Sequence, residues 1–278
     1  MVDKLVAFQG VRGAYSEQAC RERLPDYQVV PHRSFEEVFQ AVDEGQCQLG
    51  MVPVENSMAG AVGDSNDLLA IHNLHIVGEY YLRVRHCLLG VPGSDSTTIQ
   101  TVISHPQALA QCASYIRTHG WQRVSYYDTA GSAQEVSQQG DASMAAIASA
   151  LSAELYKLDI LDRDIQDSRQ NTTRFVMIAR EPLPRCEANA CKTSLLFEVR
   201  DIPAALYKCL GGFATNGINL TRLESRPAPG KPWAYHFYLD FQGRSDDTRG
   251  RLALEELAFF TTSIKILGCY PEARKPVE

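Results

Sequence analysis

Polar side chains gather in four short segments of this sequence, and their types suit the binding and positioning of a small polar ligand. Three segments follow strand-like apolar runs, where open parallel sheets place ligand-binding groups. The fourth, Asn171-Thr172-Thr173-Arg174-Phe175, precedes such a run. Each segment alone can be read as a capped loop or a solvated strand start, but several converging polar strand ends indicate a site. The candidate side chains of the first three segments are Asn56, Ser57, Ser104, Gln107, Thr129 and Ser132.

A glycine-bearing turn lies between a strand-like run and a helix start at Gly10-Val11-Arg12-Gly13-Ala14-Tyr15-Ser16-Glu17. Free backbone N–H groups and the helix dipole at such a turn favour an anion. The turn lacks the GxGxxG pattern, so a nicotinamide cofactor is not expected. The eight cysteines are scattered, with no CxxC pair and no nearby histidine that would complete a zinc site, which predicts reduced, mostly buried thiols and no metal site.

Strand-like and helical patterns alternate through the first 180 residues, which predicts an α/β region with mostly parallel sheets covered by helices. Ser34, followed three residues later by Glu37, has the capping-box pattern of a helix start. A run at residues 80–89 is long enough to cross between two lobes, so a cleft between them is expected. The expected strands are residues 5–9, 28–31, 49–54, 80–89, 101–104, 123–127, 145–148 and 174–179, and the expected helices are residues 16–24, 34–44, 106–118, 132–139 and 150–156.

Two prolines and three charged residues at 180–185 mark a linker, after which the pattern changes. The remaining residues predict strand, helix, strand, strand, helix and strand, the βαββαβ order of a ferredoxin-like α+β unit. We therefore expect an α/β region at residues 1–181 and a second unit at residues 192–272. Within the first region, one lobe is expected at about 1–78 with 160–181 and the other at 79–159.

Composition excludes several classes of protein. The chain has 278 residues, of which 45% are hydrophobic and 22% charged, as in a globular protein of about two domains. A net charge of -6 without a Lys/Arg cluster argues against nucleic-acid binding. No apolar run approaches the roughly 20 residues of a membrane-spanning helix, and the N-terminus lacks a signal-peptide pattern. A cytoplasmic protein without membrane association is expected.

Taken together, these segments resemble the prephenate dehydratase family. They occur in the order seen in that family: the GxxGAYSEQA stretch, the Pro-Val-Glu-Asn-Ser segment, Ser104-His105-Pro106-Gln107, Asp128-Thr129-Ala130-Gly131-Ser132-Ala133, and the cluster that ends in Phe175. The resemblance covers nearly the whole chain. It implies two catalytic lobes folded like a periplasmic binding protein, an active site in the cleft, and a C-terminal ACT regulatory domain. No chorismate mutase segment precedes Met1, so a monofunctional enzyme is expected.

The resemblance also implies the reaction, in which prephenate loses carbon dioxide and water to give phenylpyruvate without a metal or organic cofactor. Aromatisation of the ring supplies the driving force. The essential residue of the family is the threonine before the Arg-Phe pair, which matches Thr173. Its hydroxyl is expected to donate a hydrogen bond to the departing oxygen, and the six strand-end side chains are expected to position the substrate or bind its carboxylates.

Arg174 has two interpretations. Strand alternation places Thr173 and Phe175 on one face and Arg174 on the other. Arg174 is therefore either a charge partner of the substrate or a structural ion-pair residue, and the sequence leaves this open.

Two C-terminal segments, residues 201–206 and 223–227, resemble the family motifs that bind phenylalanine between ACT domains of neighbouring subunits. The family usually has glycine where this chain has Ala204, so the added methyl can crowd a ligand that needs close backbone approach. Pairing of ACT domains implies a homodimer or homotetramer. The candidate effector-binding residues are Ala204, Ala205, Leu206, Glu224, Ser225, Arg226 and Pro227.

Three other functions compete with this one. Arogenate dehydratase performs the same chemistry on the transaminated side chain, and the sequence does not exclude it. A solute-binding protein would share the two lobes, but it needs an export signal and has no use for the Thr173 cluster. An amino-acid sensor that has lost catalysis is disfavoured by the intact polar cluster.

Overall fold

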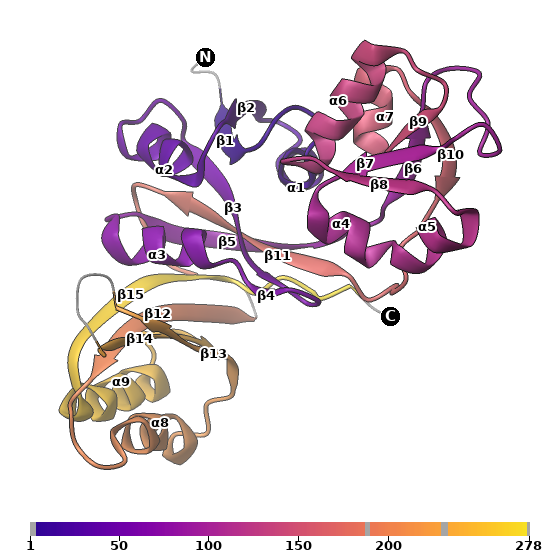
Figure 1. The fold of residues 1–278 in the computed structure, drawn as a ribbon. Helices are drawn as coiled ribbons and strands as arrows, with labels where there is room; N and C mark the ends of the chain where they lie inside the picture. Colours follow the sequence, from indigo (N-terminus) through magenta and orange to yellow (C-terminus); the bar gives the residue numbers. More distant parts are fainter. Residues whose placement is uncertain (1–3, 187–189, 229–232, 277–278) are drawn as a thin grey trace.

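Three β-sheets organise the chain within residues 4–186, 190–228 and 233–276, the parts that this computed structural model describes (Figure 1). Two sheets form the lobes of the N-terminal region, and the third belongs to the C-terminal unit. Among the described residues, no helix is both long and apolar enough to cross a membrane.

The first lobe is built on a sheet with the strand order β2-β1-β3-β11-β5, and the short strand β4 pairs with β3. β1 is parallel to β2 and β3, whereas β11 is antiparallel to β3 and β5, so the sheet is mixed and the expectation of a mostly parallel sheet is wrong. Its strands are β1 (Leu5–Gln9), β2 (Gln28–His32), β3 (Leu49–Asn56), β4 (Gly60–Ala61), β5 (His75–Arg83) and β11 (Thr172–Ala179), and its helices are α1 (Tyr15–Arg23), α2 (Phe35–Asp43) and α3 (Gly63–Ile71).

Helix α2 begins with a side-chain cap that the sequence predicts, whereas helix α1 begins without one. The Ser34 hydroxyl accepts from Glu37 N at 3.3 Å, and the Glu37 carboxylate accepts from Arg33 N at 2.8 Å, so α2 begins where its capping pattern indicates. α1 begins at Tyr15, one residue before the expected start, and its cap position is occupied by Ala14, which offers no side-chain acceptor.

The second lobe has a sheet with the order β10-β6-β9-β7-β8, in which β7 is parallel to β8 and β9, and β6 is antiparallel to β9 and β10. Helices α4 and α5 pack on one face of this sheet, and α6 and α7 pack on the other (Figure 1). The elements are β6 (Cys87–Gly90), β7 (Thr101–Ser104), α4 (Pro106–Gln111), α5 (Ala113–His119), β8 (Gln122–Ser125), α6 (Thr129–Gln139), β9 (Met144–Ala148), α7 (Ala150–Tyr156) and β10 (Asp159–Arg163).

Several boundaries differ from the expected ones. The single crossing strand at 80–89 is two strands, β5 and β6, and the polar stretch after residue 158 contains β10. The lobes therefore meet at residues 84–86 and 164–171 rather than at 78 and 160. The expected helix at 106–118 is divided at Cys112 into α4 and α5, and α6 starts at Thr129 because Asp128 caps it by accepting from Gly131 N.

The C-terminal unit has the expected element order. Its antiparallel sheet runs β13-β14-β12-β15, and both helices pack on one face of the sheet (Figure 1). The elements are β12 (Cys191–Val199), α8 (Ala205–Thr215), β13 (Leu220–Pro227), β14 (Tyr235–Gln242), α9 (Thr248–Phe260) and β15 (Thr261–Pro271).

The other face of the C-terminal sheet packs on the first lobe. Tyr238 and Leu267 of the C-terminal sheet belong to the same buried apolar cluster as Val54 and Leu68 of the first lobe. The Tyr238 hydroxyl also donates to Asn66 O at 2.7 Å. The C-terminal unit thus has a core of its own between its sheet and helices, and it also shares a second apolar cluster with the first lobe.

Two of the eight cysteines depart from the expected reduced state. Cys186 and Cys191 are joined by a disulfide, with their Cα atoms 6.4 Å apart. Their spacing of five residues is not a CxxC pattern, which is why this pair was not predicted. The remaining cysteines are free and are mostly buried, as expected.

Candidate active site

Asn56 at the end of β3 lies directly opposite Thr173 at the start of β11. Asn56 Nδ2 donates to Thr173 Oγ1 at 2.9 Å and to Asn171 Oδ1 at 2.9 Å. Asn56 Oδ1 accepts from the backbone N–H groups of Met58 at 3.0 Å and Ala59 at 2.9 Å. These backbone donors fix which end of the amide faces Thr173, so Thr173 Oγ1 is the acceptor in this contact. The hydroxyl proton of Thr173 is therefore available to a second acceptor.

A chain of hydrogen bonds continues from Asn171 into the second lobe. Asn171 Nδ2 donates to Gln111 Oε1 at 2.9 Å, and the same oxygen lies 2.8 Å from His86 Nε2. His86 Nδ1 lies 2.8 Å from the hydroxyl of Tyr15 on α1. Because an amide oxygen can only accept, His86 Nε2 carries the proton in this contact. The chain thus joins the Thr173 end of β11 to helix α4 and to the start of α1.

Burial keeps the ionisable members of this chain uncharged. Desolvation lowers the pKa of His86 below its ordinary value, although the hydrogen bond to Gln111 acts in the opposite direction. Desolvation also raises the pKa of Tyr15 well above its ordinary value. At neutral pH the hydrogen-bonded chain from Thr173 to Tyr15 is therefore uncharged.

A cavity of about 360 Å³ adjoins these residues between the lobes. It is lined by Met58 and Ala59 of the first lobe, by one face of α4, and by the segment that returns to β11. Thr173 does not line this cavity, but it shares the Asn56 amide with Asn171, which does. The cavity is large enough for a small organic molecule, since such sites span roughly 300 to 1,000 Å³.

Two predicted site residues of the second lobe turn away from the cleft. The Ser104 hydroxyl is fully buried and donates to Ile147 O at 2.6 Å. The Ser132 hydroxyl is also buried and donates to Thr129 O at 2.6 Å, within the first turn of α6. Both protons are therefore used inside the lobe, and these residues support the fold around the cleft. Thr129 is half-buried at the start of α6.

The remaining strand-end candidates, Gln107 and Ser57, lie in different lobes and line different cavities. Gln107 is exposed on α4 and lines the 360 Å³ cavity with Gln111. The Ser57 hydroxyl instead donates to Gln170 O at 2.6 Å and accepts from Thr172 N at 2.9 Å. Ser57 thus ties the loop after β3 to the start of β11 and orients Thr173 through the backbone.

The glycine-bearing turn already holds an anion of its own. The fully buried Glu17 carboxylate accepts from Gly13 N at 2.7 Å and from Arg12 Nε at 3.0 Å. The hydroxyls of Ser149 and Ser152 at the start of α7 donate to Gly13 O at 2.7 and 3.0 Å. A Cβ at residue 13 would lie 2.7 Å from Ser152 Oγ, and φ is +90° there, so glycine is required at this contact between the lobes.

Arg174 points away from the cleft and into a buried cluster between the first lobe and the C-terminal sheet. Arg174 Nε lies 2.8 Å from Glu79 Oε2, Nη1 pairs with Asp240, and Nη2 donates to the Tyr270 hydroxyl at 3.0 Å. Lys192 Nζ lies 2.7 Å from the other oxygen of Glu79. We call Glu79, Arg174, Lys192 and Asp240 the interface charge cluster. The structure thus gives Arg174 the ion-pair position that the sequence left as one of two interpretations.

Side chains of opposite charge contact one another in this buried cluster. The side chains of Glu79, Arg174, Lys192 and Asp240 are at most 4% exposed. Burial opposes the charged form of Asp240, but the Arg174 guanidinium outweighs it and holds the pKa of the Asp240 carboxyl below its ordinary value. The cluster joins β11 to β12 and β14, and Lys192 Nζ also lies 3.6 Å from Glu272 Oε1 at the edge of the cluster.

Comparison with known proteins places this geometry in a family. Residues 6–183 match the family model described as prephenate dehydratase. The chain belongs to the prephenate dehydratase family. The matched range contains both lobes, the Asn56–Thr173 pair and the hydrogen-bonded chain to Tyr15.

Relatives with prephenate dehydratase in their names match nearly the whole chain. Arogenate dehydratase/prephenate dehydratase 1 of Arabidopsis thaliana is 44% identical over 96% of this chain and 71% of the relative. A bifunctional N-acyl-homoserine lactone acylase/prephenate dehydratase of Komagataeibacter europaeus is 43% identical over 99% of both. The crystal structure of prephenate dehydratase from Arthrobacter aurescens in complex with L-Phe superimposes with a TM-score of 0.88, at 30% identity over 98% of this chain and 92% of that one.

Several residues of the candidate site were not predicted from the sequence. Gln111 lies four residues after Gln107 on α4, so helical spacing was an available signal that both face the cleft. Asn171 and Tyr15 stand inside the family motifs without having been selected. No local pattern marks His86, which enters the site only because β5 ends at the junction of the lobes.

The buried neutral His86 makes the stability of the protein depend on pH. Because its folded pKa lies below the unfolded value of about 6.5, the unfolded chain takes up a proton first as pH falls. His86 therefore costs no stability above about pH 6.5 and destabilises the fold as pH drops below it. Urea unfolding at decreasing pH should show a smaller loss of unfolding free energy for His86→Gln than for wild type. His119→Gln, at an exposed histidine, is the matched control, and an equal loss in all three proteins would contradict this role of His86.

Proposed function

We propose that the protein catalyses the decarboxylating dehydration of prephenate to phenylpyruvate, with Thr173 as hydrogen-bond donor to the departing hydroxyl. The observation that carries this proposal is the fixed orientation of Asn56, whose Nδ2 donates to Thr173 Oγ1 and leaves the threonine proton for the substrate. Aromatisation drives the reaction, so the protein only has to assist the leaving oxygen and hold the carboxylates. A threonine hydroxyl is a very weak acid, which favours hydrogen-bond donation over complete proton transfer.

The substrate would lie in the 360 Å³ cavity, which is linked to Thr173 through Asn171 and Asn56. Gln107 and Gln111 present amide groups from α4, and Asn171 presents one from the first lobe. Amide N–H groups can donate to carboxylates without the cost of burying a second charge. We assign these amides to substrate positioning, and we assign no substrate contact to Arg174, Ser104 or Ser132.

An activity assay with two substrates tests this function. Purified protein incubated with prephenate should release phenylpyruvate, whereas incubation with L-arogenate tests the alternative, which would release phenylalanine. The first Arabidopsis relative carries both activities in its name, so the ratio of kcat/KM for the two substrates decides between them. If neither product forms, the protein is not a dehydratase of this kind.

The C-terminal unit is proposed to be an ACT domain that binds L-phenylalanine between two subunits. Its βαββαβ order and its edge strand β13, which carries Glu224 and Ser225, support pairing with a second copy in a homodimer or homotetramer. The Arthrobacter aurescens relative was crystallised with L-Phe. We also keep the cytoplasm as the expected location.

The candidate effector residues lie at the start of α8 and along β13. Ala204 has φ +58°, a left-handed conformation that glycine adopts more easily, and it precedes α8. Ala205 is buried and Leu206 half-buried at the start of that helix. In β13, Ser225 and Pro227 are exposed. Arg226 pairs with Asp67 of the first lobe in two hydrogen bonds of 2.9 Å, so this guanidinium contacts the catalytic region of its own chain.

Replacing Glu224 or Ser225 by alanine should weaken phenylalanine binding and feedback inhibition while leaving the uninhibited kcat unchanged. Both residues lie on the proposed pairing strand, far along the sequence from the Thr173 site. Calorimetric titration with L-phenylalanine measures the binding, and Thr221→Ala, on the same strand outside the motif, is a control. Wild-type affinity in both motif variants would place the effector elsewhere.

A further inference from the structure

Helix α3 directly follows the hairpin formed by β3 and β4, and it lies against the C-terminal sheet (Figure 1). Arg222 of β13 donates from Nη2 to Asn66 Oδ1 at 3.0 Å. Lys265 of β15 donates from Nζ to two carbonyls at the end of the helix, Leu69 O at 2.9 Å and Ala70 O at 3.1 Å. Side chains of the C-terminal sheet thus hold α3 near its middle and at its end.

Asn66 connects this helix to the hairpin that precedes it. Its side chain is fully buried, and its Nδ2 donates to Val54 O at 3.2 Å and to Val62 O at 3.0 Å. The two carbonyls only accept and the Arg222 guanidinium only donates, so the orientation of the amide is fixed at both ends. Asn66 therefore joins the base of the hairpin, at Val54 and Val62, to a side chain of the C-terminal sheet.

The β3–β4 hairpin, residues 54–62, carries Asn56, which donates to Thr173 Oγ1. Val62 N donates to Val54 O at 3.0 Å, so the backbone closes the hairpin at the same two residues that Asn66 holds. Asn56 is only two residues from Val54, and a shift of the base of the hairpin moves Asn56 relative to β11. The contacts of Asn66 therefore help to fix the position of the group that orients Thr173.

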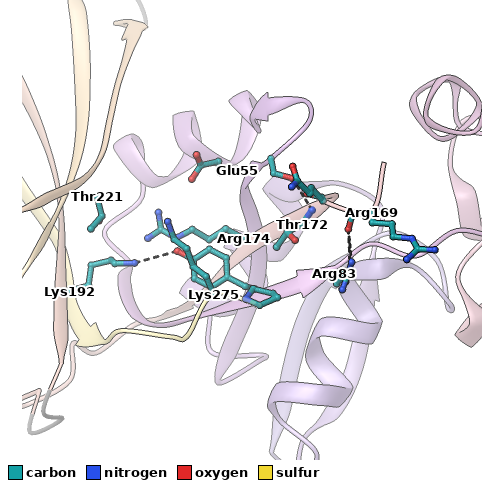
Figure 2. A pocket seen from close by; sticks show the side chains of 12 residues that line it. Glu55, Arg83, Arg169, Thr172, Arg174, Lys192, Thr221 and Lys275 are labelled. Atoms are coloured by element: carbon teal, nitrogen blue, oxygen red, sulfur yellow. Dashed lines mark hydrogen bonds between the residues drawn. The ribbon is translucent and has the colours of Figure 1, made fainter. Parts of the chain in front are cut away.

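Strand β13 approaches the same hairpin from the C-terminal unit. Thr221 of β13 and Glu55 of β3 line one cavity, of about 650 Å³, between the first lobe and the C-terminal sheet (Figure 2). The next residue on β13 is Arg222, whose Nη2 lies 2.5 Å from Glu224 Oε2, so one nitrogen contacts both Glu224 and Asn66. In the part of the chain that the structure describes, the buried Arg222 Nε has no hydrogen-bond partner. The contact with Asn66 thus depends on a guanidinium that a proposed effector residue, Glu224, also holds.

We propose that Asn66 is a positioning residue of the dehydratase reaction, and that Arg222 makes this positioning depend on the C-terminal unit. The inference rests on the proposed function, because it concerns the orientation of Thr173. Asn66 does not line the 360 Å³ cavity, so it acts through the hairpin and not on the substrate. Glu224, Arg222 and Asn66 form a contiguous route from the proposed effector strand to the hairpin that carries Asn56. Coupling between two sites can be carried by such hydrogen-bond networks.

Kinetics of three variants test the role of Asn66. Asn66→Asp keeps an acceptor for Arg222 and removes both donors to the hairpin, so kcat on prephenate should fall about tenfold to hundredfold while KM changes less than about threefold. Arg222→Met keeps both donors and should lower kcat by about threefold. Tyr238→Phe is the matched control, because it removes a hydrogen bond to the backbone oxygen of Asn66 and leaves the amide in place, and its kcat should equal that of wild type. A kcat for Asn66→Asp within about twofold of wild type overturns the proposal.

Hydrogen–deuterium exchange of the β3–β4 hairpin tests the same link without an activity assay. Exchange reports local opening of backbone hydrogen bonds such as the one from Val62 N to Val54 O. It should be about tenfold faster in Asn66→Asp, faster than wild type also in Arg222→Met, and unchanged in Tyr238→Phe. Wild-type exchange in Asn66→Asp, or in Arg222→Met where Asn66→Asp does not fold, overturns the link. An inactive wild-type protein instead overturns the proposed function, even where exchange changes as expected.

Inhibition by L-phenylalanine tests the route through Arg222, because general damage to the fold does not uncouple inhibition from binding. In calorimetry, Arg222→Met should bind L-phenylalanine within about threefold of the wild-type affinity, but saturating L-phenylalanine should leave it a larger fraction of its activity than it leaves wild type. Loss of binding would make Arg222 a ligand of the effector, and full inhibition with intact binding would remove Arg222 from the route. Either result overturns the coupling, whereas a wild-type enzyme that does not bind L-phenylalanine overturns the proposed effector function.

Discussion

Thr173→Ala should lower kcat on prephenate by about 10² to 10⁴, the usual contribution of a positioned proton donor. The smallest decrease consistent with this role is about tenfold. Thr173→Ser should retain substantial activity, because the hydroxyl stays within reach of Asn56 Nδ2. Thr172→Ala is the matched control, since this neighbouring threonine lies on the opposite face of β11, where it lines a cavity between the first lobe and the C-terminal sheet. It should keep a kcat close to wild type.

Steady-state kinetics of the three variants, with circular dichroism to confirm folding, decide this prediction. A loss that appears in kcat with little change in KM indicates an interaction made in the transition state. An alanine variant that turns over like wild type would remove Thr173 from the mechanism, and an equal loss in Thr172→Ala would indicate damage to β11 instead.

Asp240→Ala should lower the free energy of unfolding by about 3 to 5 kcal/mol, because it leaves the buried Arg174 guanidinium without one of its two carboxylates. The control is Asp246→Ala, which breaks the Arg244–Asp246 ion pair, where the Asp246 side chain is 64% exposed. That change should cost no more than about 1 kcal/mol, as is usual for surface pairs.

Urea unfolding measures both variants, and a double variant separates pairing from packing. Arg174→Met/Asp240→Leu removes both charges and leaves Glu79 paired with Lys192, so it should recover much of the stability that Asp240→Ala loses. If Asp240→Ala and Asp246→Ala cost the same, the interface charge cluster contributes nothing to stability. The same cluster implies that a fragment ending near Arg180 loses partners of Arg174 and Glu79, together with the C-terminal part of the shared apolar core.

Signals within one element could be read from the sequence. The alternation along β11 separates Thr173 from Arg174, the capping pattern starts α2, and the C-terminal pattern of apolar runs predicts βαββαβ. Each depends on residues only a few positions apart. The same holds for Gln111, which helical spacing from Gln107 could have added to the candidates.

Contacts between residues far apart in the sequence could not be predicted from local patterns. Arg174 and Asp240 are 66 residues apart, and neither has a neighbour that indicates the other. The hydroxyls of Ser104 and Ser132 have the right type for a site, but backbone carbonyls close to them in the fold accept their protons. Residue type and order therefore identify the family and the Thr173 end of β11, whereas the direction in which each side chain points depends on tertiary packing.

The second lobe is inserted between β5 and β11, which are neighbours in one sheet, and this determines how the cleft can move. Val84 N donates to Asn171 O at 2.8 Å where the two connections leave the first lobe, so they form a single narrow hinge. The Asn56–Thr173 pair lies entirely on the first-lobe side of this hinge. Rotation of the second lobe would separate Gln111 from Asn171 and Ser149 from Gly13, yet it would leave the threonine donor oriented. The Asn56–Thr173 pair is thus held by the first lobe alone, whereas the contacts of Gln111 and Ser149 depend on the position of the second lobe.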